Sequence, residues 1–321
     1  MNPRLRTLLA AQDGVLSTAD AASVGVDVPG LRRACRNGEL VRIRRGAYAD
    51  AHLYAAATYE RRYRFDVKAI LRSRPGDAAS HHAALVLAGV PTYDVDLGTV
   101  DISSTVAGTR RQAGVRVHPP PTHYVPRGMW LSVPLTLALV QVGANSGLIA
   151  GVCSMDHALF RGWCTHDGLQ AAALALPGPR AREAAFRALE RVDGAAESVG
   201  ETRTRLLLTD LGFGCRSQVW LDTDQGPARV DLLIDGLVVV EFDGLIKYAG
   251  ADGRDALARE KLRESALVRL GYEVERVIWS DLNNPAALAR RIHQARTRAL
   301  SRRHHGVAYS SQASAKQRGK W

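Results

Sequence analysis

The stretch that decides the fold of the C-terminal part of the chain is RVDLLIDGLVVVEFDGLIK, residues 229–247. Two short runs rich in Val, Leu and Ile flank Asp235-Gly236, a dipeptide that favours a tight reversal, so the stretch predicts a β-hairpin. Acids interrupt these strands at Asp231, Glu241 and Asp243. A carboxylate in a strand suited to burial is costly unless a cation or hydrogen bonds compensate it. Several converging carboxylates therefore suggest a hard divalent ion such as Mg²⁺.

The length of the hairpin loop decides whether the acids meet, because side chains alternate between the two faces of a strand. With a two-residue loop, Asp231 pairs with Val240 and Glu241 points to the opposite face. With a three-residue loop, or a bulge with Gly236 in a left-handed conformation, we expect Asp231 opposite Val239 and diagonal to Glu241. A metal site formed by Asp231 and Glu241 therefore requires an odd loop or a bulge.

This stretch resembles the core of the PD-(D/E)XK nuclease superfamily, especially its very-short-patch-repair-like branch. In those nucleases an acid on one strand and an acid-x-acid-Gly run on the next strand bind the metal. The resemblance matches Glu201, in ESVGETRTRLLLTDLGF, to an upstream acid on the preceding helix. It matches REKLRESALVRLGYEVERVIWSDL to a closing helix and strand. The similarity covers residues 195–298 and implies a restriction-endonuclease-like α/β domain.

The resemblance also implies a set of catalytic residues: Glu201, Asp231, Glu241, Asp243 and Lys247. If the domain is catalytic, Asp231 and Glu241 hold Mg²⁺ or Mn²⁺ and Glu201 completes or orients the shell. Asp243 stands where the family has its catalytic Lys. Either Lys247 or Lys261 substitutes for that residue, or cleavage is lost.

The first fifty residues have the pattern of a winged helix-turn-helix, residues 1–50. Leucines between residues 5 and 9 have helical spacing, and Ser17 precedes Asp20 by three residues, as in a helix cap. A second helix is expected to about Ser23. A third is expected in LRRACRNG, and a small hairpin, or wing, in LVRIRRGAYA. In such a plan the third helix enters the major groove of duplex DNA.

Arginine is concentrated in this third helix and wing. Six arginines and a single acid lie between Pro29 and Tyr48. We expect these side chains to contact DNA: Arg32, Arg33, Arg36, Arg42, Arg44 and Arg45. The alternative is a solvated basic face in an Arg-biased protein, since only five of the 43 basic residues are Lys. A net charge of +11 favours a polyanionic partner through counterion release.

Residues 1–190 resemble antitoxins of the AbiEi family. In the N-terminal part the similarity lies in GVLSTADAASVGV and GELVRIRRGAYAD. Residues 51–190 are expected to form a helical or mixed middle domain. In that domain the similarity lies in SHHAALVLAGVPTY, GVRVHPP and SVPLTLALVQV. In that family the N-terminal domain binds operator DNA to repress its own operon, and the protein counteracts a nucleotidyltransferase-like toxin. The resemblance therefore implies double-stranded DNA and such a toxin as partners.

Three further features limit the class of protein. The four cysteines have no CxxC spacing, which favours a reducing cytoplasm over a disulfide framework or a zinc ribbon. The uncharged stretch 131–155 has the length of a membrane span, but Pro134 and Gly143 divide it, so we expect two buried helices and no membrane contact. Residues 299–321 predict a basic, disordered tail.

The pair His81-His82 resembles a metal motif only at first sight. Adjacent histidines point in different directions on a helix, and no acid or Cys lies at ligand spacing nearby. We therefore expect packed histidines on a helix that Ser80 caps.

The sequence predicts a multidomain α/β protein, α+β overall, and two functions remain open for it. The first is a DNA-binding autoregulator and antitoxin whose nuclease-fold domain, residues 195–298, serves binding or partner contact. The second is a Mg²⁺-dependent endonuclease that its winged helix targets to DNA. A fold alone does not decide between them.

Overall fold

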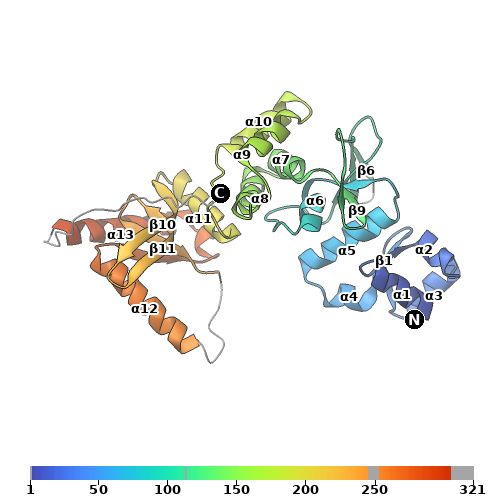
Figure 1. Ribbon diagram of the computed structural model, residues 1–321, viewed down its shortest axis with the longest axis horizontal. Helices are drawn as coiled ribbons and strands as arrows, with labels where there is room; N and C mark the ends of the chain where they lie inside the picture. The colour runs from blue at the N-terminus through green and yellow to red at the C-terminus, as the bar shows by residue number, and fades with distance from the viewer. Residues whose placement is uncertain (1, 113, 245–252, 305–321) are drawn as a thin grey trace. The chain divides into compact units, whose positions relative to one another are not determined.

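The computed structural model describes residues 2–112, 114–244 and 253–304. This part of the chain is a mixed α/β protein with three β-sheets, which confirms the predicted fold class (Figure 1). The chain divides into two compact units. The first comprises Met1–Ser154 with Cys164–Glu190, and the second comprises Met155–Trp163 with Arg191–Trp321.

The N-terminal elements form the expected winged helix-turn-helix. They are α1 (Pro3–Ala11), β1 (Val15–Ser17), α2 (Thr18–Ser23), α3 (Val28–Arg36), β2 (Leu40–Arg44) and β3 (Ala47–Asp50). The strands form a small antiparallel sheet in the order β1-β3-β2. Ser17 and Asp20 form the predicted capping box at α2. Leu5, Leu31 and Tyr48 belong to one buried core, which packs the helices against the sheet.

Two following helices cover this winged helix-turn-helix, α4 (Ala51–Ala56) and α5 (Tyr59–Arg72). Arg72 at the end of α5 donates two hydrogen bonds to Asp20, at 2.7 and 2.6 Å. Lys68 of α5 forms a 2.8 Å ion pair with Asp13. The winged helix-turn-helix is therefore held by α5, and a fragment that ends at residue 50 lacks these contacts.

The rest of the first unit contains a six-stranded sheet and a group of helices. The strands are β4 (Ala78–Ala79), β5 (Val100–Ser103), β6 (Arg110–Gln112), β7 (Val115–His118), β8 (Val125–Arg127) and β9 (Trp130–Ser132). Their order is β6-β7-β5-β4-β9-β8, and β5 and β7 are parallel. The helices are α6 (His81–Ala88), α7 (Leu135–Asn145), α9 (His166–Leu174) and α10 (Pro179–Leu189).

The uncharged stretch 131–155 forms strand and helix segments rather than one long helix. After β9, α7 ends at Asn145, and α8 (Leu148–Phe160) begins after Gly147, whose φ is +105°. The two predicted helices are confirmed. In the parts of the chain that the structure describes, no helix has the length and apolar character needed to cross a membrane.

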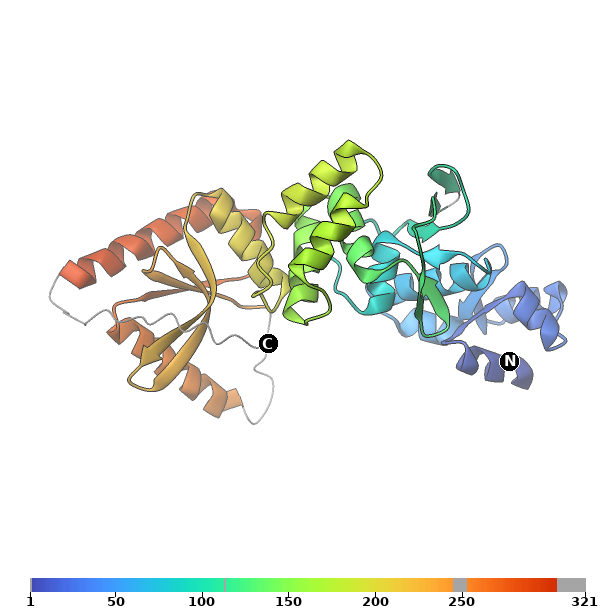
Figure 2. The ribbon, with the colours of Figure 1, turned by 45° about the horizontal axis from the view of Figure 1, so that its top comes forward.

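The second unit is an α/β arrangement built on a four-stranded sheet. Its elements are α11 (Val199–Asp210), β10 (Cys215–Thr223), β11 (Gly226–Ile234), β12 (Val238–Phe242), α12 (Gly253–Arg269), β13 (Glu273–Val277), a 3₁₀ turn η1 (Asp281–Asn283) and α13 (Pro285–His304). The strand order is β10-β11-β12-β13, antiparallel except for the parallel pair β12 and β13. Helices α11 and α13 lie on one face of the sheet and α12 lies on the other (Figure 2).

The β11–β12 hairpin has the odd loop that a shared acidic face requires. Ile234 pairs with Val238 across the three-residue loop 235–237, in which Asp235 and Gly236 both have positive φ. The partner predicted for Asp231 with a three-residue loop is wrong by two residues. Val239 lies opposite Leu233 and not opposite Asp231. The same register, continued one step, sets Asp231 directly across from Glu241.

The prediction of a disordered tail over residues 299–321 is wrong for its first residues. Helix α13 continues to His304, so residues 299–304 are helical. The reason is packing, because Ile292, Ala295 and Ala299 are fully buried in the core beneath the sheet. Residues 305–321 lie outside the described part of the chain.

The contact between Arg72 and Asp20 gives a first prediction. Hydrogen bonds to charged groups contribute about 1.5–3 kcal/mol, so Arg72→Ala should lower the free energy of unfolding of the first unit by about that amount or somewhat less. Burial opposes ionisation of Asp20, but Arg72 and Ser17 outweigh it and lower the pKa of Asp20. A lowered pKa stabilises the fold above the unfolded value of about 4, so the loss should shrink as pH falls below that value toward the folded pKa.

Urea unfolding followed by circular dichroism at pH 7 and at about pH 3 measures this difference. The control is Arg187→Ala, which removes an exposed ion pair with Glu183 on α10. Such pairs contribute only about 0.2–0.5 kcal/mol. Equal losses of unfolding free energy in the two variants would show that the contact of Arg72 with Asp20 stabilises the fold no more than an exposed ion pair does.

Candidate functional site

The third helix of the winged helix-turn-helix presents an arginine face. Asp27 caps α3 by accepting a 2.8 Å hydrogen bond from the backbone N–H of Gly30. Leu31 and Ala34 are buried in the N-terminal core. The neighbouring positions on the opposite side of the helix are exposed and carry Arg32, Arg33 and Arg36. Helical periodicity thus separates an apolar face from a cationic one.

The wing holds its three arginines in different environments. Arg42 and Arg45 are exposed. Arg44 is half-buried, its Nη1 has no hydrogen-bond partner in the described structure, and burial together with nearby Arg74 lowers its pKa. Arg44 is therefore less open to a phosphate than the other two.

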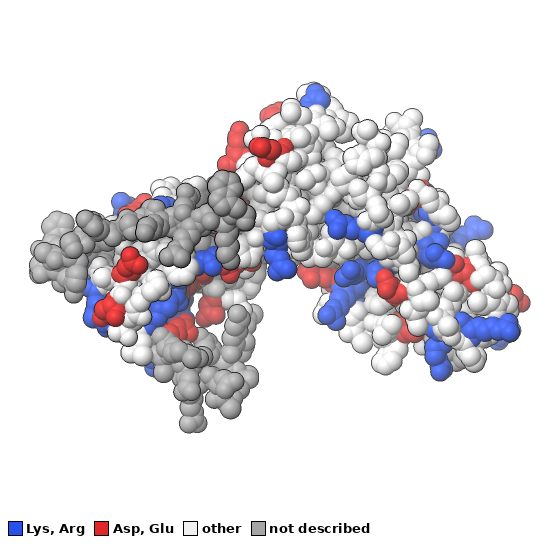
Figure 3. Space-filling model, in the orientation of Figure 1, with Lys and Arg blue, Asp and Glu red and all other residues white. Residues whose placement is uncertain are grey.

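The exposed arginines of α3 and the wing are not neutralised by acids. Within the described residues, no ion pair involves Arg32, Arg33, Arg36, Arg42 or Arg45, and Figure 3 shows Lys and Arg side chains spread over the N-terminal elements. Many arginines of the second unit pair with acids. Examples are Arg269 with Asp224 at 2.7 Å and Arg291 with Asp281 at 3.0 Å. The arginines of α3 and the wing thus keep their positive charge available where the predicted DNA contacts lie.

The second unit contains the predicted acids on its α12 side. Asp231 Oδ2 accepts a hydrogen bond of 2.9 Å from the backbone N–H of Phe242. Glu241 Oε1 lies 2.7 Å from Arg263 Nη2 of α12. By strand alternation Asp231 and Glu241 share the sheet face of Leu233 and Val239, which α12 covers.

Glu201 reaches the same region from α11. Ser198 caps this helix by accepting from the backbone N–H of Glu201 at 3.2 Å. The buried Glu201 carboxylate accepts from the backbone N–H of Glu197 at 2.9 Å and from Gln218 Nε2 at 2.7 Å. Gln218 has φ +52° and interrupts the β10–β11 ladder opposite Asp231. The strained backbone of Gln218 thus directs its amide to the acid of the helix.

The acids affect one another electrostatically. Burial raises the pKa of Asp231, and the charge of Glu241 raises it further, against the hydrogen bond from Phe242. Burial also raises the pKa of Glu201, and the charge of Asp231 adds to this effect. Asp231 therefore lies within electrostatic reach of both Glu241 and Glu201, and a cation beside it would relieve this repulsion.

The remaining predicted residues are placed as follows. The backbone N–H of half-buried Asp243 donates to Val277 O at 2.8 Å, which extends the β12–β13 ladder by one residue. Lys247 lies outside the described residues. Lys261 is exposed on α12. The cation that reaches the acids is Arg263, which the sequence analysis missed although it lies one helical turn before the buried Leu267.

A three-carboxylate metal cage is not formed by these acids. In the described part of the chain, Glu201, Asp231 and Glu241 do not bring three ligand oxygens within 4.8 Å of one another. Asp231 and Glu241, directly across the hairpin, are the pair that would hold Mg²⁺ with water completing the shell, because Mg²⁺ commonly uses one or two carboxylates. The ion would have to compete with Arg263 for Glu241.

The expectation of packed histidines is confirmed, since both side chains are buried, but their surroundings differ from the expected ones in two respects. Ser80 makes no side-chain cap bond at α6. An acid does lie beside the histidines, because Asp101 of β5 is 3.3 Å from His82 and 2.5 Å from His118. Sequence spacing could not show this, since strands β5 and β7 bring the acid and the third histidine to α6 from a distance along the chain.

Comparison with known proteins identifies the N-terminal part. Residues 3–49 match the family model described as "Transcriptional regulator, AbiEi antitoxin". The winged helix-turn-helix is therefore of the type found in AbiEi transcriptional regulators and antitoxins. No curated protein matches the chain.

The raised pKa of Asp231 gives a second prediction. A carboxyl group whose folded pKa is raised favours the fold at low pH, and this contribution is lost as pH rises through the folded pKa. Asp231→Asn keeps an oxygen that accepts from Phe242 and removes the charge. The variant should therefore have a higher Tm than the wild type at pH 8, and the advantage should disappear near pH 4.

Thermal unfolding across pH 4–8 measures this effect. Asp222→Asn on the exposed side of β10 is the control and should leave the difference in Tm independent of pH. A lower Tm for Asp231→Asn at pH 8 would show that the charge of Asp231 is favourable and that the acids do not repel one another.

Proposed function

We propose that this protein is a DNA-binding transcriptional autoregulator and antitoxin of an AbiE-like toxin–antitoxin system. Its winged helix-turn-helix binds operator DNA near its own gene, and a nucleotidyltransferase-like protein is its cognate toxin. It acts in the cytoplasm. The observation that carries the proposal is the set of exposed, unpaired arginines on α3 and the wing within the AbiEi-type segment.

The physical argument concerns where positive charge is left unsatisfied. Arginine guanidinium groups bind phosphates and guanine edges when they are exposed and not held by acids. In the proposal, Arg32 and Arg36, one helical turn apart on α3, read base edges. Arg33, Arg42 and Arg45 bind the phosphate backbone, with Arg44 in support from its half-buried position.

The second unit serves binding or partner contact in this proposal. Its element order is a helix, three antiparallel strands, a helix and a parallel strand, which supports a PD-(D/E)XK-like core. The two acids that would hold a metal already contact protein groups. Glu241 forms an ion pair with Arg263, and Asp231 accepts a hydrogen bond from the backbone N–H of Phe242. Asp243 in place of the catalytic Lys also favours a binding role.

A second candidate function is a metal-dependent endonuclease that the winged helix-turn-helix targets. The raised pKa values of Asp231 and Glu201 favour it, because a divalent cation would relieve the repulsion between these carboxylates. In that mechanism Asp231 and Glu241 hold Mg²⁺ or Mn²⁺ and orient a water nucleophile, and Glu201 orients the shell. Lys247 would stabilise charge on the phosphate in the transition state.

The regulator proposal predicts operator binding that depends on α3. Full-length protein should bind the DNA upstream of its own gene, and Arg32→Ala/Arg36→Ala should weaken this binding by about 10-fold or more, since a base contact contributes about 1–3 kcal/mol. Arg45→Ala should weaken specific and nonspecific DNA about equally and reduce the salt slope by about 1. Fluorescence anisotropy at several salt concentrations measures both effects.

The matched control for this experiment is Arg180→Ala/Arg187→Ala, which removes two exposed positive charges from α10. Its operator affinity should stay close to that of the wild type. If the α3 double variant also binds like the wild type, the recognition-helix assignment is wrong.

A cleavage assay separates the two candidate functions. Wild-type protein and Asp231→Ala are incubated with plasmid DNA and Mn²⁺. We expect no product from either protein, because Arg263 neutralises Glu241 and the position of the catalytic Lys is an Asp. Product from the wild type that is lost in Asp231→Ala would establish the endonuclease, whereas equal product from both would indicate a contaminating nuclease.

A further inference from the structure

A cluster of three histidines surrounds one buried acid in the first unit. We call His81, His82, Asp101 and His118 the histidine cluster. His81 and His82 begin α6, Asp101 lies on β5, and His118 ends β7. His118 pairs with Ser103 in the parallel ladder, so it lies two residues along from the partner of Asp101 and on the same face.

The acid at the centre of the histidine cluster is completely buried. Asp101 has 0% exposure, and its Oδ1 lies 2.5 Å from His118 Nε2. Its Oδ2 faces His82 Nδ1 at 3.3 Å, but in the described structure neither of these two buried atoms has a hydrogen-bond partner. The ring of His81 stacks on that of His118, with centroids 4.0 Å apart. An unsatisfied buried carboxylate oxygen beside imidazole nitrogens is costly and requires an explanation.

We propose that His81, Asp101 and His118 form a binding site for a divalent transition-metal ion of the zinc class. One ligand atom from each of the three residues lies within 4.8 Å of the others. Two imidazoles and one carboxylate are a donor set that Zn²⁺ binds with three protein ligands and one open position. The borderline-soft imidazoles disfavour Mg²⁺ and Ca²⁺, which take oxygen ligands.

Charged groups surround His81 and Asp101. Burial, helped by the charge of His118, lowers the pKa of His81 to about 3. Burial opposes ionisation of Asp101, but the hydrogen bond from His118 and the charges of the histidines outweigh it and lower its pKa. One cation also faces the acid, since Arg116 Nη1 is 3.4 Å from Asp101 Oδ1.

Neighbouring polar groups fix the orientation of each imidazole. His81 Nδ1 lies 3.1 Å from Ser80 Oγ, and His81 Nε2 lies 3.2 Å from Asn145 Nδ2. His118 Nδ1 lies 3.4 Å from Thr109 Oγ1, which gives a proton on that nitrogen a partner when Nε2 turns to the ion. Such outer partners orient histidine ligands in metal sites.

His82 has a different role from the other two histidines. Its Nε2 lies 3.0 Å from Thr99 O, and its ring stacks on Tyr63 at 5.3 Å. These contacts hold its Nδ1 toward the free oxygen of Asp101. In the proposed site His82 does not bind the ion.

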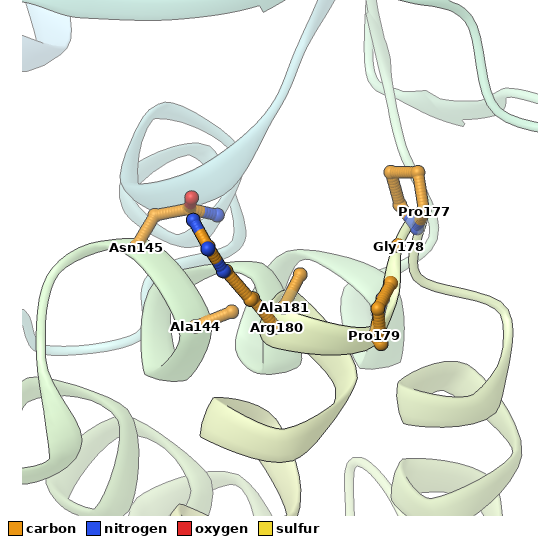
Figure 4. Close-up of a pocket in the computed structure, with 7 residues that line it drawn as sticks. All are labelled: Ala144, Asn145, Pro177, Gly178, Pro179, Arg180 and Ala181. Atoms are coloured by element: carbon orange, nitrogen blue, oxygen red, sulfur yellow. The ribbon is translucent and has the colours of Figure 1, made fainter.

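Two features of the backbone and the surface support the assignment. His81 has φ +50°, a left-handed conformation that is uncommon for residues other than glycine and is often kept at functional sites. Asn145, which contacts His81, also lines an open pocket of about 470 Å³ (Figure 4). In that pocket the side chain of Arg180 extends toward Asn145 (Figure 4). Asn145 thus connects the buried cluster with a solvent-accessible wall.

Binding of an ion would require His118 and Asp101 to move apart. Two ligand atoms at Zn–N and Zn–O distances of about 2.0–2.1 Å in tetrahedral geometry lie about 3.3 Å apart. His118 Nε2 and Asp101 Oδ1 are 2.5 Å apart. His118, which is less buried than the acid, is the side chain that would move.

The test is a metal titration of the full-length protein after treatment with a chelator. Co²⁺ should bind at one equivalent per chain with visible absorption bands of a nitrogen and oxygen site, and Zn²⁺ should displace it. His118→Asn should weaken binding by more than about 100-fold, since even loss of an outer partner costs about 10- to 100-fold. X-ray absorption of the zinc-loaded wild type should show two imidazoles and no sulfur.

Three control variants separate this site from other metal-binding groups. His123→Asn alters an exposed histidine of the same unit, and His304→Asn/His305→Asn removes the paired histidines near the C-terminus. Asp231→Asn/Glu241→Gln removes the acid pair of the second unit. All three should retain one equivalent of tightly bound Co²⁺. Retention of tight binding in His118→Asn, loss of it in any control, or sulfur ligation in the wild type would overturn the proposal, and the X-ray result holds even if His118→Asn does not fold.

Discussion

The structure depends on the requirement that a buried carboxylate must be compensated by hydrogen bonds or by a cation. Asp156 of α8 is the most complete case, with 0% exposure. It accepts hydrogen bonds from the backbone of Asp193 at 2.8 Å, from Thr202 Oγ1 at 2.9 Å and from Arg205 Nη2 at 2.9 Å. One carboxylate thus fixes a loop and α11 in the second unit. Loss of such an acid would leave several buried donors without partners.

The same requirement explains how the two units use their charged residues. In the second unit most of the acid charge is taken up by arginines, so structure and charge balance are met together. In the winged helix-turn-helix, Asp20 is compensated by Arg72 and Asp13 by Lys68. The arginines of α3 and the wing are left without acids. A chain rich in arginine for compositional reasons can therefore still have a localised cationic surface, because pairing and not abundance decides which charges remain available.

Local signals made the N-terminal fold predictable. The capping box at Ser17 and the apolar spacing of α1 act over a few residues, and both are present as expected. The sequence showed that Asp231 and Glu241 share a face of the sheet only if the hairpin loop has an odd number of residues. Which residues pair across the hairpin is seen only in the structure. The histidine cluster and the contact of Arg263 with Glu241 join elements distant in the chain. A single sequence does not contain that information, because spacing along the chain is not distance in space.

The three-residue loop of the β11–β12 hairpin has a consequence for the evolution of this protein. Surface loops usually accept insertions and deletions, since little packing depends on them. Here, a change of one residue in loop length would turn every side chain of β12 to the opposite face of the sheet. Glu241 would then enter the apolar layer with Leu208 and Ile292, and Val240 would leave it. We therefore expect length variation among descendants of this gene to be confined to other loops, and this turn to tolerate only substitutions.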